Sequence, residues 1–146
     1  MHIQEDFKEL LRLLENNSVK YMIVGGYAVA FHGYPRFTKD IDIFFDSSND
    51  NIQKIIKSLL EFGFNKKELD KELFSTSGNV ITFGVEPIRV DLINEIDGVS
   101  FKEAFPKIIR GIYGDITVSF IGRKELIKNK LSTKRLKDKA DIEELS

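Results

Sequence analysis

The chain has 146 residues, which is enough for one compact domain and too few for two independent hydrophobic cores. Its hydrophobic fraction of 42% and charged fraction of 31% are ordinary for a folded protein and argue against disorder. It has no Cys, which excludes disulfide scaffolds, thiolate zinc sites and Cys nucleophiles, and only two His, so a bound metal would take oxygen ligands.

Helical and strand patterns alternate in the first third of the chain. Apolar residues at helical spacing predict a helix over residues 3–14, which stops at Asn16-Asn17-Ser18. The apolar run 21–24 predicts a buried strand that breaks into a tight turn at Gly25-Gly26. A short helix is expected next, over residues 27–31, and a second strand over residues 41–45.

The remaining pattern completes a small sheet with helices around it. Residues 52–60 carry the apolar stripe of a core-facing helix, which Asn49 or Asp50 can cap. Residues 80–83 and 88–93 predict an antiparallel hairpin. A helix over 101–109, a strand over 116–120 and two C-terminal helices follow. We therefore expect one α+β domain spanning residues 1–146, with a small mixed or antiparallel sheet flanked by helices.

The charges are unevenly distributed, although the net charge is only −1. Residues 123–139 contain eight Lys or Arg against two acidic residues, so a basic C-terminal segment accompanies an acidic remainder. Such a segment can hold polyphosphate or nucleic acid, and a solvated helix face explains it equally well. The sequence shows neither a signal peptide nor an apolar run of the roughly 20 residues that cross a bilayer, so we expect a cytoplasmic protein without membrane association.

The most informative pattern is Gly25-Gly26 followed, after thirteen residues, by Asp40-Ile41-Asp42-Ile43. Because strand side chains alternate, Asp40 and Asp42 project to the same side of their strand. Two carboxylates this close repel each other unless a cation lies between them, and Mg²⁺ prefers such oxygen ligands. The glycines would let backbone N–H groups approach a phosphate. A plain tight turn and a solvated strand end are the structural alternatives.

Asp91 is the candidate for a third carboxylate. Alternation places it on one face of its strand with Arg89 and Ile93, opposite Val90 and Leu92. If this strand pairs beside the strand 41–45, three carboxylates meet and can hold two magnesium ions, one to activate an acceptor oxygen and one to neutralise a leaving pyrophosphate. An N-cap or an ion pair with Arg89 is the structural alternative.

These motifs together resemble the nucleotidyltransferase superfamily, whose fold is that of the DNA polymerase β palm. The resemblance rests on Gly25-Gly26, on Arg36-x-Thr38-x-Asp40-Ile41-Asp42-Ile43 and on Asp91. The chain is most similar to the small AbiEii-like bacterial proteins. Their late basic helix motif resembles Lys130-Leu131, Arg135-Leu136-Lys137-Asp138 and Asp141-Ile142.

The resemblance implies transfer of a nucleoside monophosphate from an NTP to an acceptor hydroxyl or phosphate, with release of pyrophosphate. It implies that Asp40 and Asp42 bind Mg²⁺ or Mn²⁺, and that Asp91 binds metal or accepts the acceptor's proton. Phosphoryl-type transfer needs such positioning and charge neutralisation more than a covalent nucleophile. The substrate-binding residues implied are Gly25, Gly26, Arg36, Thr38 and Lys130.

Two hypotheses of different classes follow. The first is a metal-dependent nucleotidyltransferase whose acceptor is RNA, a protein or a small molecule. The AbiEii likeness implies a toxin–antitoxin or phage-defence role with an antitoxin partner. A homodimer is the alternative, in which a second subunit holds the acceptor. The second is a non-catalytic nucleotide- or RNA-binding module that keeps the fold. The presence of all three carboxylates favours the first, because a binding module could lose one and relieve their repulsion.

Overall fold

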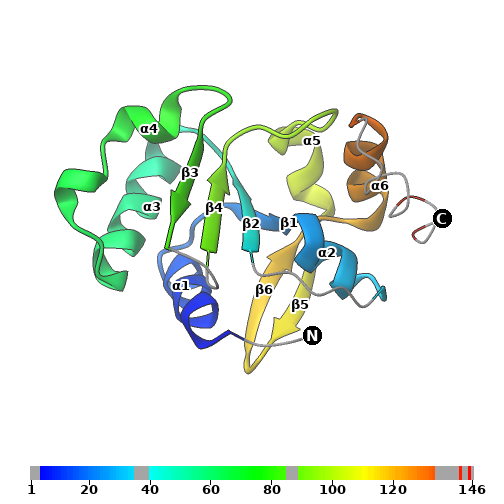
Figure 1. Cartoon of the computed structure of the whole chain (residues 1–146), viewed down its shortest axis with the longest axis horizontal. Helices are drawn as coiled ribbons and strands as arrows, with labels where there is room; N and C mark the ends of the chain where they lie inside the picture. Colours follow the sequence, from blue (N-terminus) through cyan, green and yellow to red (C-terminus); the bar gives the residue numbers. More distant parts are fainter. Residues whose placement is uncertain (1–3, 35–39, 85–88, 134–141, 143–144, 146) are drawn as a thin grey trace.

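The computed structural model describes residues 4–34, 40–84, 89–133, 142 and 145. Within these residues six strands form one sheet in the order β3-β4-β2-β1-β6-β5, and helices surround it (Figure 1). The strands are β1 Tyr21–Val24, β2 Asp40–Phe45, β3 Val80–Phe83, β4 Arg89–Ile93, β5 Ile109–Tyr113 and β6 Ile116–Phe120. The helices are α1 Glu5–Asn16, α2 Gly25–Phe31, α3 Asn49–Phe62, α4 Lys71–Ser75, α5 Phe101–Ala104 and α6 Arg123–Leu131, with short 3-10 turns η1 Lys66–Glu68 and η2 Phe105–Lys107.

The sheet is mixed, as the sequence predicted. β2 lies at its centre, antiparallel to β1 and parallel to β4. Two antiparallel hairpins form the edges, β3 with β4 and β5 with β6, and β6 joins β1 in parallel. The predicted hairpin of residues 80–93 is therefore confirmed in its described part, and it pairs directly with the strand that carries Asp40 and Asp42.

The two faces of the sheet have different partners. One face packs its aliphatic residues, including Ile23, Ile43 and Leu92, into a core that contains the apolar sides of α1 and α3. The opposite face packs Met22 and Phe44 with residues of α2, α5 and α6. In Figure 1, α5 and α6 lie together on the side of the molecule away from α3 and α4. The strand carboxylates belong to the second face.

The helix predicted over residues 101–109 is wrong in its second half. Ser100 starts α5 with a capping box, in which its side chain accepts from the Glu103 backbone while the Glu103 side chain accepts from Ser100. α5 ends at Ala104, and Pro106 lies in the 3-10 turn that follows, where it cannot donate a helical hydrogen bond. Ile109 begins β5, which pairs along its full length with β6. Apolar spacing alone could not distinguish this short strand from a helix end.

The other helices agree with prediction except in detail. The N-cap of α3 is Ser48, not the predicted Asn49 or Asp50, and the helix ends at Phe62 with Gly63 as its C-cap at a φ of 121°. α4 and η1 lie in a stretch for which the sequence predicts no element. The second C-terminal helix falls largely outside the described residues. No helix in the described part of the chain has both the length and the apolar character of a membrane-spanning segment.

Candidate active site

The parallel pairing of β2 with β4 brings the three predicted carboxylates together. In the register of these strands Asp42 lies opposite Asp91, and Asp40 lies opposite Arg89. Strand alternation then places Asp40, Asp42 and Asp91 on one face. The row continues across the sheet, with Val24 of β1 beside Asp42 and Thr82 of β3 beside Asp91. The convergence expected from the sequence is therefore present.

Asp91 is held by two hydrogen-bond donors. The Thr82 hydroxyl donates to Oδ1 at 2.7 Å, and Arg89 donates from Nε to Oδ1 and from Nη2 to Oδ2, each at 3.1 Å. Burial acts to raise the pKa of the Asp91 carboxyl, but the hydrogen bonds from Arg89 and Thr82 outweigh it and lower that pKa below its usual value. Asp91 is thus an ionised carboxylate, although it is 7% exposed.

The pKa of the Asp42 carboxyl is shifted in the opposite direction from that of Asp91. Burial, the neighbouring Asp91 and the charge of Asp40 together raise the pKa of Asp42 to about 6, while Lys130 acts in the other direction. The Asp42 carboxyl therefore holds a proton more readily than the Asp91 carboxyl when no cation is bound. A bound cation would reverse this balance, because it favours the ionised form of all three carboxyls.

Gly25 lies against Asp42 where the chain leaves β1 and enters α2. Its φ is +68°, in the left-handed region, and a Cβ built there would lie 2.3 Å from Asp42 Oδ2. Glycine is therefore required at this position for two independent reasons, backbone conformation and close approach. Gly26 follows as the second residue of α2.

Lys130 reaches the same place from α6. It is 4% exposed and, with Gly25 and Asp42, lines a cavity of about 210 Å³. Contacts with the segment after β4 hold α6 there: Asn129 Nδ2 donates to the Asp97 carbonyl at 2.9 Å, and Ser132 packs against Gly98. Lys130 therefore lies near the carboxylates, and its position depends on the docking of a helix.

The donor set fits a cation that is completed by substrate. Within the described residues, no group of three or more acidic or His side chains is arranged to hold a metal ion by itself. Mg²⁺ in phosphate-transferring sites typically uses one or two carboxylates and takes its other ligands from water and substrate phosphates. Asp42 with Asp91 or Asp40 satisfies that pattern, and the absence of a Cβ on Gly25 allows the Asp42 carboxylate to occupy its place in the cluster.

Two of the predicted site residues, Arg36 and Thr38, lie outside the described part of the chain. The structure also places at the site residues that the sequence did not predict. The sequence-based prediction does not include Thr82. The register of the predicted hairpin would have identified it, because Thr82 of β3 lies opposite Asp91 of β4. Glu95 and Asp97 also line the cavity, and sequence reasoning misses them because the segment after β4 follows no strand or helix pattern.

Comparisons with known proteins identify the family and the fold of this chain. The whole chain, residues 1–146, matches the family described as nucleotidyltransferase of unknown function, DUF6036. The chain belongs to this nucleotidyltransferase family. No curated protein matched the sequence.

Two solved structures share the fold of this nucleotidyltransferase. One is a Thermotoga maritima protein, TM1012, described as a nucleotidyltransferase. It has 15% sequence identity and a TM-score of 0.64, and the match covers 98% of this chain and 94% of that one. The other is LnuA, a lincosamide antibiotic adenylyltransferase solved with lincomycin, with 19% identity and a TM-score of 0.56 over 99% and 98% of the two chains. At these identities the likeness establishes the fold alone.

Proposed function

We propose that this protein transfers a nucleoside monophosphate from an NTP to an acceptor, with Mg²⁺ or Mn²⁺ bound by Asp40, Asp42 and Asp91. One observation carries the proposal: Asp42 is buried beside a second carboxylate, and the neighbouring Gly25 leaves no side chain over it. Burying like charges together is unfavourable unless a cation neutralises them. A divalent ion with an NTP is the ligand that membership of a nucleotidyltransferase family implies for such a cluster.

The reaction is a substitution at the α-phosphorus. The acceptor oxygen forms a bond to that phosphorus, the bond to the bridging oxygen of pyrophosphate breaks, and the acceptor proton passes to a base. A bound divalent ion would neutralise the developing charge on the phosphate oxygens. Asp42 and Asp91, held by the paired strands β2 and β4, would hold that ion beside the reacting phosphate. In the alternative, Asp91 is the base that accepts the acceptor's proton.

Lys130 supplies the positive charge for the triphosphate in this proposal. Its ammonium is buried in the cavity next to Asp42, where low exposure strengthens its attraction for a phosphate. Gly26, Arg36 and Thr38 are proposed as further substrate contacts because of their places in the superfamily motif. The acceptor is proposed to be RNA, a protein or a small molecule. A toxin–antitoxin role, with an antitoxin partner or a homodimer, stays a prediction from the AbiEii likeness.

The first prediction concerns transfer by the Asp42→Asn variant. With each of the four α-³²P-labelled NTPs, Mg²⁺ and fractions of cellular RNA, protein and small molecules, the wild-type protein should label an acceptor and release pyrophosphate. Asp42→Asn should lower that rate by at least about a hundredfold, because it removes a charge that holds the cation in the transition state.

The matched control for this prediction is Asp46→Asn. Asp46 directly follows β2 and accepts a hydrogen bond from Ser48 at 2.9 Å, outside the carboxylate cluster. Its variant should keep full activity. Equal transfer by wild type and Asp42→Asn would remove Asp42 from the mechanism. NTP binding without transfer to any acceptor fraction would favour a non-catalytic nucleotide-binding module.

A further inference from the structure

A guanidinium group lies among the carboxylates where a metal ion is proposed to bind. Arg89 contacts both oxygens of Asp91 at 3.1 Å, and its Nε is 4.0 Å from Asp40 Oδ2. This side-on, two-point contact is the strongest geometry that an Arg and a carboxylate form. Arg89 therefore already supplies part of the positive charge that the cluster requires.

The strand register explains why this arginine is present. Arg89 lies opposite Asp40 and two residues before Asp91, so both carboxylates share a face with it. The carboxylates sit on short side chains fixed to the sheet, and the Asp91 side chain is only 10% exposed. The Arg89 side chain is long and 41% exposed, so it can leave the cluster without any movement of the backbone.

We infer that Arg89 and the divalent cation compete for the Asp91 carboxylate. In the cation-free protein Arg89 neutralises the cluster, and cation binding displaces its guanidinium from Asp91. This inference rests on the proposed function, because it assumes that the cluster is a cation site. It assigns Arg89 to the metal-binding equilibrium, as a competitor of the cation for Asp91.

Two observations favour competition over a role of Arg89 in aiming Asp91 at the metal. Thr82 already orients Asp91 by donating to Oδ1 at 2.7 Å, so a second orienting donor is not needed. Arg89 also engages both oxygens of Asp91, and a metal must take a lone pair from at least one of them.

The test is a titration of the full-length protein with Mn²⁺ alone, without nucleotide, followed by electron paramagnetic resonance of the free ion. Arg89→Gln should bind Mn²⁺ between about three- and tenfold more tightly than wild type, as expected for loss of a partly exposed competing ion pair. Arg89→Lys should fall between the two, because Lys keeps the charge and loses the two-point contact.

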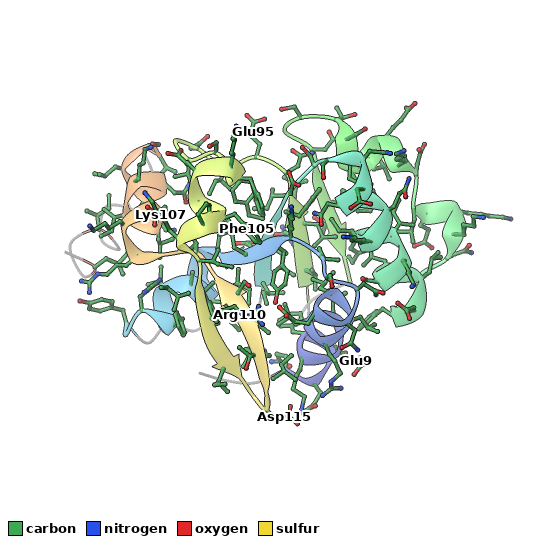
Figure 2. The ribbon with its side chains drawn as sticks, turned by 180° about the vertical axis from the view of Figure 1, so that it is seen from behind. Glu9, Glu95, Phe105, Lys107, Arg110 and Asp115 are labelled. Atoms are coloured by element: carbon green, nitrogen blue, oxygen red, sulfur yellow. The ribbon has the colours of Figure 1, made fainter. Side chains whose placement is uncertain are left out.

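Arg12→Gln is the matched control. Arg12 bridges two carboxylates in a similar way, Glu9 at 2.6 Å and Asp115 at 3.7 Å, and its side chain is 39% exposed. Figure 2 shows Glu9 and Asp115 at the opposite end of the molecule from Glu95, which lines the candidate site. Arg12→Gln should therefore leave the Mn²⁺ affinity unchanged.

Equal or weaker Mn²⁺ binding by Arg89→Gln, with wild-type circular dichroism, would overturn the inference and leave the proposed function standing. If Arg89→Gln fails to fold, Arg89→Lys decides: tighter binding supports competition, and equal or weaker binding rejects it. Binding by Arg89→Gln but not by wild type would support it in its strongest form. Absence of Mn²⁺ binding in wild type and in every Arg89 variant would overturn the inference, while the proposed function, in which substrate completes the metal site, would still be decided by the transfer assay.

Discussion

Gly25 determines both the backbone conformation at the start of α2 and the position of the Asp42 carboxylate. The Asp42 carboxylate occupies the position that a Cβ on residue 25 would need, so the carboxylate can lie there only because residue 25 is glycine. The same glycine has a positive φ at the point where β1 ends and α2 begins. Its substitution should therefore affect both the fold and the site.

We expect Gly25→Ala to lower the free energy of unfolding by about 1–2 kcal/mol from left-handed backbone strain, and to abolish transfer because it displaces Asp42. Gly78→Ala is the control, since Gly78 has a φ of +84° but no heavy atom within 4 Å of the place where its Cβ would lie. Urea unfolding should show comparable losses of stability for both variants, and the transfer assay a loss for Gly25→Ala alone. Wild-type activity in Gly25→Ala would contradict this account of the site.

At the scale of elements, the site is assembled by one strand pair and one docked helix. β2 and β4 fix the carboxylates through their parallel register, while α6 brings Lys130 to them. α6 is connected to α5 by the ion pair of Lys128 with Glu103 at 3.0 Å. Glu103 also closes the capping box of α5, so one carboxylate stabilises a helix start and joins two helices.

This double role predicts a pH dependence. The backbone N–H of Ser100, followed by Lys128, lowers the pKa of the Glu103 carboxyl below its usual value. A carboxyl with a lowered folded-state pKa stabilises the fold above its unfolded-state pKa, and that contribution is lost as the pH falls through the folded value. Glu103→Gln should lower the melting temperature by a few degrees at pH 7, and the difference should vanish in acid.

Thermal melts between pH 7 and pH 3 check this prediction, with Glu68→Gln as the control. Glu68 is an exposed glutamate of η1, away from α5 and α6. Its variant should follow the wild type across the pH range. A difference between Glu103→Gln and wild type that persists undiminished at pH 3 would show that the side chain acts through packing and not through charge.

At the scale of the whole molecule, one face of the sheet packs against the larger hydrophobic core and the other face carries the candidate site. The face covered by α1 and α3 is filled by aliphatic and aromatic residues. The other face carries three carboxylates in one cluster, and the raised pKa of Asp42 means that its ionised form lowers the stability of the cation-free protein. A site that destabilises the fold is the usual cost of a pre-arranged charge cluster.

Asp42→Asn should consequently be more stable than wild type when no metal is present, by about 1 kcal/mol at pH 7. A carboxyl with a raised folded-state pKa destabilises the fold as the pH rises, so the gain should grow from about pH 4 to about pH 6 and then stay constant. Mg²⁺ should raise the melting temperature of wild type and not of Asp42→Asn. Calorimetry with and without Mg²⁺ measures both effects, and a less stable Asp42→Asn would refute the argument.

The sequence by itself determined the local parts of the site. Alternation along a strand places Asp40 beside Asp42, and Asp91 on the face of Arg89, because successive residues of a strand point to opposite sides whatever the strand pairs with. The end of β1 before Gly25 and the hairpin of β3 and β4 were also predictable, because each depends on neighbouring residues. The tight turn predicted at Gly25-Gly26 is wrong, since both glycines belong to the first turn of α2. The end of α5 and the start of β5 were not predictable, because a short apolar run fits either element.

Only the tertiary structure decided which of these local pieces meet. Asp42 faces Asp91 because β2 and β4 pair in parallel in one particular register, and a shift by one residue would send Asp91 to the opposite face. Lys130 lies beside Asp42 because α6 docks on the segment that follows β4. Such pairings join residues far apart in the chain, so their free energy comes from packing across the whole domain, which no local pattern of residues contains.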